Sequence, residues 1–412
     1  MGKLKVFEAF AGVGAQRMAL RNLGIDFEVV GICEIDKFAL KSYEAIHGEC
    51  NNFGDISKIN PNEIPNMDLF TYSFPCQDLS IAGKREGIKE GTRSGLLYEC
   101  EKIIEAKKPK YLLLENVKNL VGKQFKNDFD KWLSYLEGLG YKNYWKVLNA
   151  KDYGVPQNRE RVFVVSVLGE HKPYKFPQPI ELNRAIKDIL EDTVDEKYYM
   201  NKPFKLVDKG NVKAEFTNIN FDQGKRIYGT GSYFQCLGAA DRSTNNILVS
   251  AYLTDFGYKQ TSKILNKEGI AATLDTMQGG HREPKILENY TVCEQRYDEG
   301  LRFFKDNICG TVRTIDSGGD KRIIETIPQF RVRKLTPLEC WRLMSFSDED
   351  FYKTKNAGIS NSQLYKQAGN SIVVKVLEGI FKNLLIDNEQ VKEITTKEEK
   401  RKDRNMQLKW CI

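Results

Sequence analysis

Short apolar runs alternate with helical stretches over the first part of this 412-residue chain. The runs predicted to be strands cover residues 5–10, 27–33, 67–73, 111–114 and 162–168. The stretches between them predict helices at 15–23, from 37 onward, at 95–106 and at 125–139. This alternation is typical of a mostly parallel, doubly wound sheet with helices on both faces. The predicted fold class is therefore α/β, in a chain long enough for a second, smaller lobe.

The pattern changes near Gly169, after which the chain is rich in Gly, Asn, Asp and Lys and lacks helical periodicity. Helix signals return at Thr336, a good N-cap that is followed by Pro337 at N1 and Glu339 at N3. A last apolar helix is expected at 372–385. We expect an α/β domain at 1–184, an irregular β-leaning domain at 185–335, a hinge with returning helices at 336–386 and a charged tail at 387–412.

Bulk composition narrows the function only loosely. The 63 Lys and Arg residues outnumber the 56 Asp and Glu residues by seven, which is compatible with nucleic-acid binding but does not establish it. Nine scattered cysteines without a C-x-x-C pair indicate reduced thiols in a cytosol, and with three histidines a metal site is not expected. No apolar stretch has the length of a signal sequence or a membrane span, so we expect a cytoplasmic protein.

A thiol and a carboxyl group follow two of the predicted strands. Cys76 lies in the run Ser73-Phe74-Pro75-Cys76-Gln77, and Glu115 follows residues 111–114. Because active sites of such folds lie at the carboxyl ends of the strands, the two side chains can face one cleft. The pair suits covalent chemistry on cytosine, in which Cys76 adds to C6, Glu115 binds the N3 side and C5 becomes nucleophilic. Taken singly, Cys76 also fits a small buried hydrophobe and Glu115 a structural carboxylate.

A glycine-containing turn at 10–14 separates the first strand from the first helix. Glycines there let the backbone approach a ligand, and Glu34, after the second strand, can accept both hydroxyls of a ribose. These two features fit NAD equally well, and the turn alone fits a structural role. Ala15 in place of a third glycine, with Asp55 and Ile56 further on, favours S-adenosylmethionine.

Five motifs in order resemble the motif set of the C5-cytosine DNA methyltransferases of the bacterial restriction-modification type. They are Phe10-Ala11-Gly12-Val13-Gly14, Pro75-Cys76-Gln77, Glu115-Asn116-Val117, Gln157-Asn158-Arg159-Glu160-Arg161 and Gly369-Asn370-Ser371. The resemblance extends from the first strand to about residue 385. It implies a Rossmann-like S-adenosylmethionine-dependent methyltransferase fold, with residues 1–184 as the catalytic and cofactor-binding domain and 185–335 as the target-recognition domain.

The resemblance also implies roles for individual residues. Cys76 is the nucleophile and Glu115 the acid, while Arg161 reaches the base O2 and Glu115, and Arg159 supports the pocket and loop. Arginines two apart otherwise form mostly solvated surface pairs, although on a strand they point the same way. The implied S-adenosylmethionine site consists of Phe10, Gly12, Gly14, Glu34, Asp55, Ile56, Pro75, Leu96, Asn370 and Ser371.

The target base lies inside stacked DNA, so this chemistry requires the nucleotide to be flipped out. The segment 78–95 holds four glycines among basic residues and is expected to close over the phosphate backbone, although a plain exposed loop is the alternative. The expected DNA contacts here are Gln77, Ser80, Lys84 and Arg93. Candidate contacts in the target-recognition domain are Lys225, Arg226, Tyr258, Lys259, Gln260, Arg282, Arg313 and Arg322.

The predicted function is a DNA (cytosine-5)-methyltransferase that acts as a monomer on a short duplex site and protects host DNA from a restriction endonuclease. A related alternative is a cytosine-5 methyltransferase that acts on transfer RNA, but the long stretch between Arg161 and Arg331 favours DNA. A DNA-binding module with decayed catalysis conflicts with the intact Cys76 and Glu115. A nicotinamide dehydrogenase would explain only the first forty residues.

Overall fold

The computed structural model describes residues 2–75, 94–200, 204–208, 211–216, 249–253, 263–277, 282–296, 300–304 and 328–387. The chain divides into two compact units, and we call 1–183 with 340–412 the catalytic unit and 184–339 the second unit. Within the described ranges, no helix is both long and apolar enough to cross a membrane.

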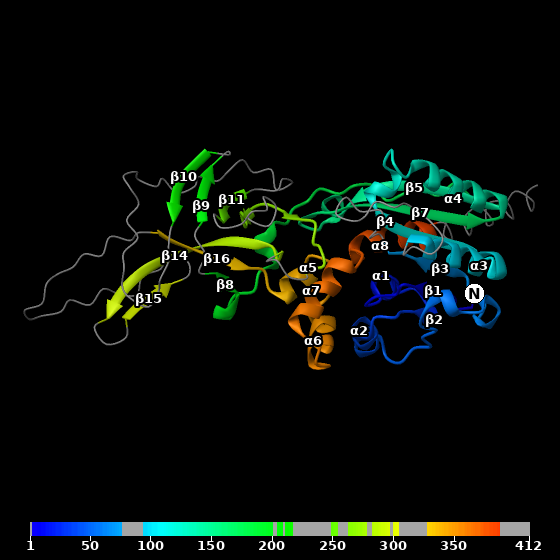
Figure 1. Cartoon of the computed structure of the whole chain (residues 1–412), viewed down its shortest axis with the longest axis horizontal. Helices are drawn as coiled ribbons and strands as arrows, with labels where there is room; N and C mark the ends of the chain where they lie inside the picture. The colour runs from blue at the N-terminus through cyan, green and yellow to red at the C-terminus, as the bar shows by residue number, and fades with distance from the viewer. Residues whose placement is uncertain are drawn as a thin grey trace, which may run out of the picture. The chain divides into compact units, whose positions relative to one another are not determined.

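A six-stranded sheet forms the centre of the catalytic unit (Figure 1). Its strands are β1 (Leu4–Ala9), β2 (Phe27–Cys33), β3 (Leu69–Tyr72), β4 (Tyr111–Val117), β5 (Tyr141–Asn149) and β7 (Glu160–Leu168). The strand order is β2-β1-β3-β4-β7-β5. The pairs among β2, β1, β3 and β4 are parallel, and β7 runs antiparallel to both β4 and β5. The predicted mostly parallel α/β sheet is confirmed.

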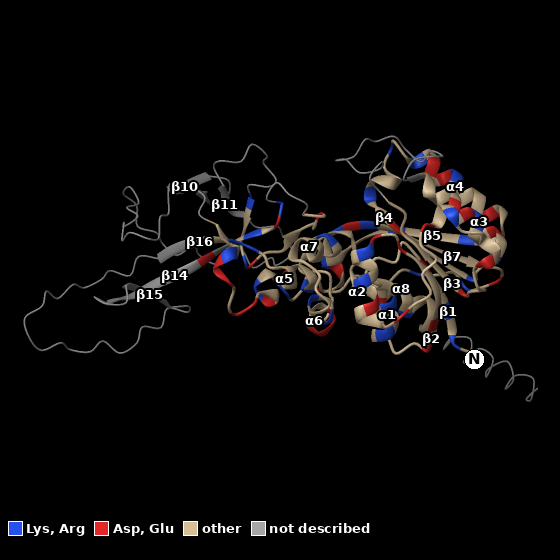
Figure 2. Cartoon of the chain, turned by 60° about the horizontal axis from the view of Figure 1, so that its bottom comes forward, with Lys and Arg blue, Asp and Glu red and all other residues tan. Residues whose placement is uncertain are grey.

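Helices cover both faces of this sheet (Figures 1 and 2). The longer helices of the catalytic unit are α1 (Ala15–Asn22), α2 (Lys37–His47), α3 (Leu97–Lys107), α4 (Lys126–Gly138), α6 (Asp348–Asn356), α7 (Asn361–Asn370) and α8 (Val374–Phe381), the last followed by a π-helical turn, Lys382–Asp387. On one face, Cys100 of α3 and Phe129 of α4 join a core with Phe70 and Leu112. Helices α1, α2 and α8 lie on the other face, where Tyr43 of α2 donates a hydrogen bond to Glu8 of β1. The outward sides of α3 and α4 carry interspersed acidic and basic residues (Figure 2).

The strand β5 was not among the predicted elements. It is the edge strand of the sheet, and it pairs in register with β7 from Tyr141↔Leu168 to Asn149↔Glu160. Its sequence mixes lysine and asparagine with aromatic residues, and most of its side chains are at least partly exposed. An edge strand of this kind lacks the apolar run by which its neighbours were recognised.

The second unit is built mainly from strands, as the sequence predicted. The main sheet follows the order β10-β9-β11-β12-β14-β16-β8, and β15 pairs with β14. The strands are β8 (Tyr199–Met200), β9 (Phe204–Asp208), β10 (Asn211–Phe216), β11 (Val249–Leu253), β12 (Lys263–Leu265), β14 (Lys285–Arg296), β15 (Gly300–Phe304) and β16 (Pro328–Lys334). Two further short strands are β6 (Gln157–Asn158) in the catalytic unit and β13 (Ala271–Ala272) in the second unit.

A buried polar cluster lies where the second unit ends. The backbone N–H of Glu339 donates to Thr336 Oγ1 (3.2 Å), and the backbone N–H of Thr336 donates to Glu339 Oε2 (2.8 Å). This reciprocal pair is the capping box that the sequence predicted for α5 (Pro337–Arg342). Arg333, which is fully buried, also donates to both Glu339 oxygens and to Glu288.

Candidate active site

The ends of β3 and β4 bring Phe74 next to the Glu-Asn-Val motif. Asn116 is buried, and its side-chain amide donates a hydrogen bond of 3.1 Å to the carbonyl oxygen of Phe74. The segment that leads to Cys76 is therefore fixed to β4 beside Glu115. Cys76 itself lies outside the described residues.

Glu115 is buried next to two guanidinium groups. Arg161 Nε lies 3.3 Å from Glu115 Oε1, because Arg161 of β7 pairs with Val117, two residues beyond Glu115 on β4. Burial raises the pKa of Glu115, and the charges of Arg161 and Arg159 lower it only in part. The carboxyl group therefore holds a proton to higher pH than an ordinary glutamate, and it can act as an acid.

Arg159 is held by the end of α7 and the residue that follows it. The guanidinium group donates to the carbonyl oxygens of Gly369 (2.9 Å) and Ser371 (2.8 Å). Its backbone N–H donates to the side-chain oxygen of Asn149 (3.0 Å). The Arg159 side chain is buried, and it links the Gln-x-Arg-x-Arg motif to the Gly-Asn-Ser motif.

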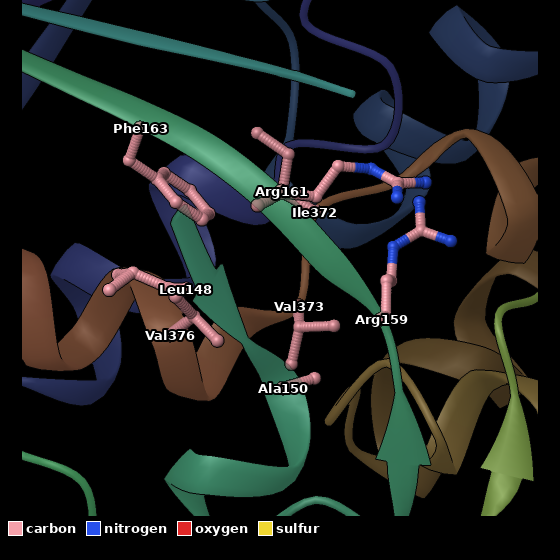
Figure 3. Close-up of a pocket in the computed structure, with 8 residues that line it drawn as sticks. All are labelled: Leu148, Ala150, Arg159, Arg161, Phe163, Ile372, Val373 and Val376. Carbon is pink, nitrogen blue, oxygen red and sulfur yellow. The ribbon is translucent and has the colours of Figure 1, made fainter. Parts of the chain in front are cut away.

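The two arginines line one pocket (Figure 3). Their guanidinium groups point toward the same region, and apolar side chains from β5, β7 and α8 lie on the other side of the pocket. The other lining residues are Leu148, Ala150, Phe163, Ile372, Val373 and Val376. The pocket thus combines two guanidinium groups with apolar side chains.

The glycine turn between β1 and α1 contains three residues in the left-handed region, with φ of 56° at Phe10, 59° at Gly12 and 80° at Gly14. A Cβ atom added to Gly14 would lie 2.4 Å from His47 Nε2. A Cβ atom added to Gly12 would meet no described heavy atom within 4 Å. Gly14 therefore allows the turn to pack against α2, whereas Gly12 leaves open space over the turn.

Glu34 joins this turn to the start of α2. Its Oε2 accepts a hydrogen bond of 2.8 Å from the backbone N–H of Gly12, and its Oε1 accepts one of 2.7 Å from that of Asp36. Asn52 donates to the Glu34 carbonyl and accepts from its N–H. Burial raises the pKa of Glu34. A fixed carboxylate beside the open space at Gly12 fits the hydroxyl groups of a ribose.

The remaining predicted cofactor residues fit the same site to different degrees. Phe10 and Leu96 pack partly buried against the core on the α3 side, and Ile56 is buried in that core. Asp55 caps a short 3-10 helix, where its Oδ1 accepts from Ser57 (3.1 Å). These residues, with the half-buried Pro75, offer the apolar surface and acceptor groups that a nucleoside requires.

The Gly-Asn-Ser motif lies at the C-terminal end of α7. Asn370 is exposed, and Ser371 Oγ donates to the carbonyl of Gln367 (2.7 Å).

Of the predicted DNA contacts, Gln77, Ser80, Lys84 and Arg93 lie outside the described residues. So do all the candidates in the target-recognition domain except Arg282, which is exposed.

Sequence reasoning assigned no role to three residues that the structure places at this site. Asn116 was quoted within its motif, and its signal is a polar residue that continues an apolar strand. Asp36 resembles any helix N-cap in the sequence. Lys366, which contacts Asp36, resembles any surface lysine, because its partner is distant in the chain.

Comparisons with known proteins agree with this geometry. The model of the family described as C-5 cytosine-specific DNA methylase matches residues 4–385. The orphan methyltransferase M.SPBetaI of Bacillus phage SPbeta is 36% identical, with 93% of this chain and 98% of that protein covered. The type II methyltransferase M2.ScrFI of Lactococcus lactis subsp. cremoris is also 36% identical, with 92% and 99% covered.

Among solved structures, the Dnmt2 methyltransferase of S. pombe has a similar fold, with a TM-score of 0.57 at 16% identity, covering 93% of this chain and 98% of that one. At this identity the likeness concerns the fold alone. The match to the family model, which spans nearly the whole chain, and the 36% identity to two methyltransferases carry the assignment. The chain belongs to the C-5 cytosine-specific DNA methylase family and is a DNA cytosine-5 methyltransferase.

Proposed function

We propose that this protein transfers a methyl group from S-adenosylmethionine to C5 of a flipped-out cytosine in a short duplex site, through a bond between Cys76 and C6. The observation that carries the proposal is Glu115, which is buried, has a raised pKa and lies beside Arg161. An acid is needed at N3 and a donor at O2 of the same ring, and these two side chains supply both. The hydrogen bond from Asn116 to the carbonyl oxygen of Phe74, two residues before Cys76, supports the place assigned to the thiol.

Each step then follows from a residue of the chain. Glu115 gives its proton to N3 and Arg161 donates to O2, which makes C6 electron-poor. The Cys76 thiolate forms a bond to C6, and the displaced electron pair makes C5 a nucleophile. S-adenosylmethionine supplies the methyl group as an electrophile on a sulfonium. C5 bonds to the methyl carbon while the methyl–sulfonium bond breaks, which would leave S-adenosylhomocysteine. The C5 proton then leaves to water, its electrons restore the C5–C6 double bond and expel Cys76 as a thiolate, and N3 returns its proton to Glu115.

The cofactor site rests on the turn at Gly12 and on Glu34. The Glu34 carboxylate accepts from the ribose hydroxyls, Asp55 accepts from the adenine amino group, and Phe10, Ile56, Pro75 and Leu96 form the apolar sides. Asn370 and Ser371 close the site at the end of α7. A methyl donor bound here lies at the same strand ends as Glu115.

Duplex DNA is the proposed substrate, and residues 184–339 are the proposed reader of its sequence. Flipping one nucleotide costs a few kcal/mol, which contacts to the extruded base and to the phosphates offset. We assign the phosphate and gap contacts to Gln77, Ser80, Lys84 and Arg93. The size of the second unit favours DNA over transfer RNA as the substrate.

The nucleophile is tested with Cys76→Ser and with a suicide substrate. The variant is expected to transfer no tritiated methyl group to duplex DNA, and the wild-type protein is expected to form a stable covalent adduct with duplex containing 5-fluorocytosine. Residual transfer by Cys76→Ser, or no adduct, would contradict the covalent mechanism. Transfer RNA offered in parallel is expected to remain unlabelled.

The cellular role is tested separately. We propose that methylation protects host DNA from an endonuclease that cuts the same site, although the relatives carry both orphan and type II names. Bisulfite sequencing of DNA from cells expressing the protein identifies the site. That DNA is then expected to resist an endonuclease specific for this site, and complete digestion would contradict the proposal.

A further inference from the structure

Two neighbouring residues of α7 donate hydrogen bonds to the N-terminal part of α2. Lys366 Nζ donates to Asp36 Oδ2 (2.7 Å). The side-chain amide of Gln367 donates to the carbonyl of Phe38 (3.0 Å) and to Ser42 Oγ (2.8 Å). Two residues from the second half of α7 therefore fix the N-terminal part of α2, although the two helices are far apart in the sequence.

Asp36 connects the start of α2 to Glu34. Its Oδ1 caps α2 by accepting from the backbone N–H groups of Phe38 (2.9 Å) and Ala39 (3.3 Å). Its own backbone N–H donates to Glu34 Oε1 (2.7 Å). Since Gly12 holds the other carboxylate oxygen, the direction of the Glu34 carboxylate depends on where the α2 turn lies.

We propose that Lys366 and Asp36 are positioning residues for the methyl donor, because their ion pair fixes the α2 turn that orients Glu34 toward the ribose hydroxyls. The inference rests on the proposed function, in which Glu34 holds that ribose. The side chains of Lys366 and Asp36 are 26% and 27% exposed, so the pair lies partly in solvent. Burial raises the pKa of Asp36, but the bond from Lys366 and the capping bonds hold it below its usual range.

The test compares two ligands that differ only at the ribose. Dissociation constants of S-adenosylhomocysteine and of its 2′-deoxy analogue are measured by calorimetry for wild type, Lys366→Met and Asp36→Asn. Asparagine keeps the helix cap but loses the ion pair. Both variants are expected to bind S-adenosylhomocysteine about tenfold more weakly, the size of one hydrogen bond to a charged group, and the deoxy analogue almost unchanged.

Two further variants serve as controls. Lys366→Arg keeps the charge and is expected to restore discrimination between the two ligands. Lys375→Met removes a lysine of α8 that is 56% exposed and pairs with Glu378, and it is expected to match wild type. In steady-state assays, Lys366→Met is expected to raise the KM for S-adenosylmethionine without changing the KM for DNA.

The possible failures are distinguishable. If Lys366→Met weakens both ligands equally, the lysine acts on general packing and the positioning role is overturned. If Glu34→Gln itself discriminates between the ligands as well as wild type does, the proposed ribose site is wrong. If Glu34→Gln loses discrimination and Lys366→Met keeps it, only the link from Lys366 to Glu34 is wrong.

Discussion

At the scale of single residues, the environment of Glu115 determines its chemistry. The group is buried beside Arg161, and burial raises its pKa more than the two arginines lower it. In the proposed mechanism the protonated form donates to cytosine N3. The rate constant of methyl transfer should therefore fall as pH rises through this raised pKa.

Glu115→Gln tests this assignment. Glutamine can still donate a hydrogen bond but cannot transfer a proton, so we expect methyl transfer to slow by about 10²–10⁴-fold and the decline at alkaline pH to disappear. Single-turnover transfer of tritiated methyl groups over neutral to alkaline pH measures both effects. The matched control is Glu160→Gln, because Glu160 is 44% exposed and pairs with Lys118. A Glu115→Gln enzyme with the wild-type pH profile would show that another group titrates.

The two glycines of the cofactor turn should respond differently to alanine. At Gly14 a Cβ atom would overlap His47, so we expect Gly14→Ala to lower the free energy of unfolding by about 1–3 kcal/mol beyond the backbone strain. Gly12→Ala has only the strain of a positive φ, about 1–2 kcal/mol, but its methyl group would occupy the open space. Thermal melting and S-adenosylmethionine binding together separate the two. A Gly12→Ala protein with normal affinity would contradict the proposed position of the cofactor.

Several site residues could be predicted from the sequence and others could not. Glu34 and Glu115 follow apolar strands, and strand ends in this fold face one cleft, so local pattern is sufficient. Lys366 and Asp36 meet only because α7 returns to α2, and no local pattern encodes that return. The orientation of Arg159 toward Gly369 and Ser371 depends on the same long-range packing.

At the scale of elements, the central strands and their helices were predicted within a few residues, because buried parallel strands are continuous apolar runs. The edge strand β5 was missed because one side of it faces solvent and its pairing with β7 is set by tertiary structure. The capping box of α5 was predicted because its signal lies within four residues, Thr336 to Glu339. The other contacts of Glu339, with Arg333 and with the backbone of Glu191, needed the structure.

Glu339 should therefore matter more than an ordinary capping residue. Its carboxylate accepts from Arg333, from the Thr336 N–H and from the Glu191 N–H, and both charged side chains are fully buried. Glu339→Ala leaves the Arg333 charge without this partner and should destabilise the second unit by about 3–5 kcal/mol. Urea unfolding measures the loss. Glu349→Ala, which removes an exposed partner of Lys353, should change the unfolding midpoint little.

At the scale of the whole molecule, the chain leaves the catalytic unit once, at residue 184, and returns to it at residue 340. The expected domain boundary lay at 335, before the capping box. The second unit extends through Glu339, and this includes the partners of the buried Arg333. The two units should therefore be divided outside this cluster of buried charges. Separating a buried charge from its partner destabilises a protein, whereas a cut in a solvated linker does not.

A segment exchange tests whether the two units perform separate functions. If residues 184–339 read the DNA sequence and the rest performs the chemistry, replacing them with the matching segment of a family member that methylates another site should transfer the target sequence. Joining the chains at 183/184 and 339/340 keeps Arg333, Glu288, Glu191 and Glu339 in one unit, whereas a junction at 335/336 separates Arg333 from Glu339. We expect the first chimaera to melt close to wild type and to methylate the donor's site, as read by bisulfite sequencing. A folded chimaera that still methylates the original site would place sequence reading in the catalytic unit instead.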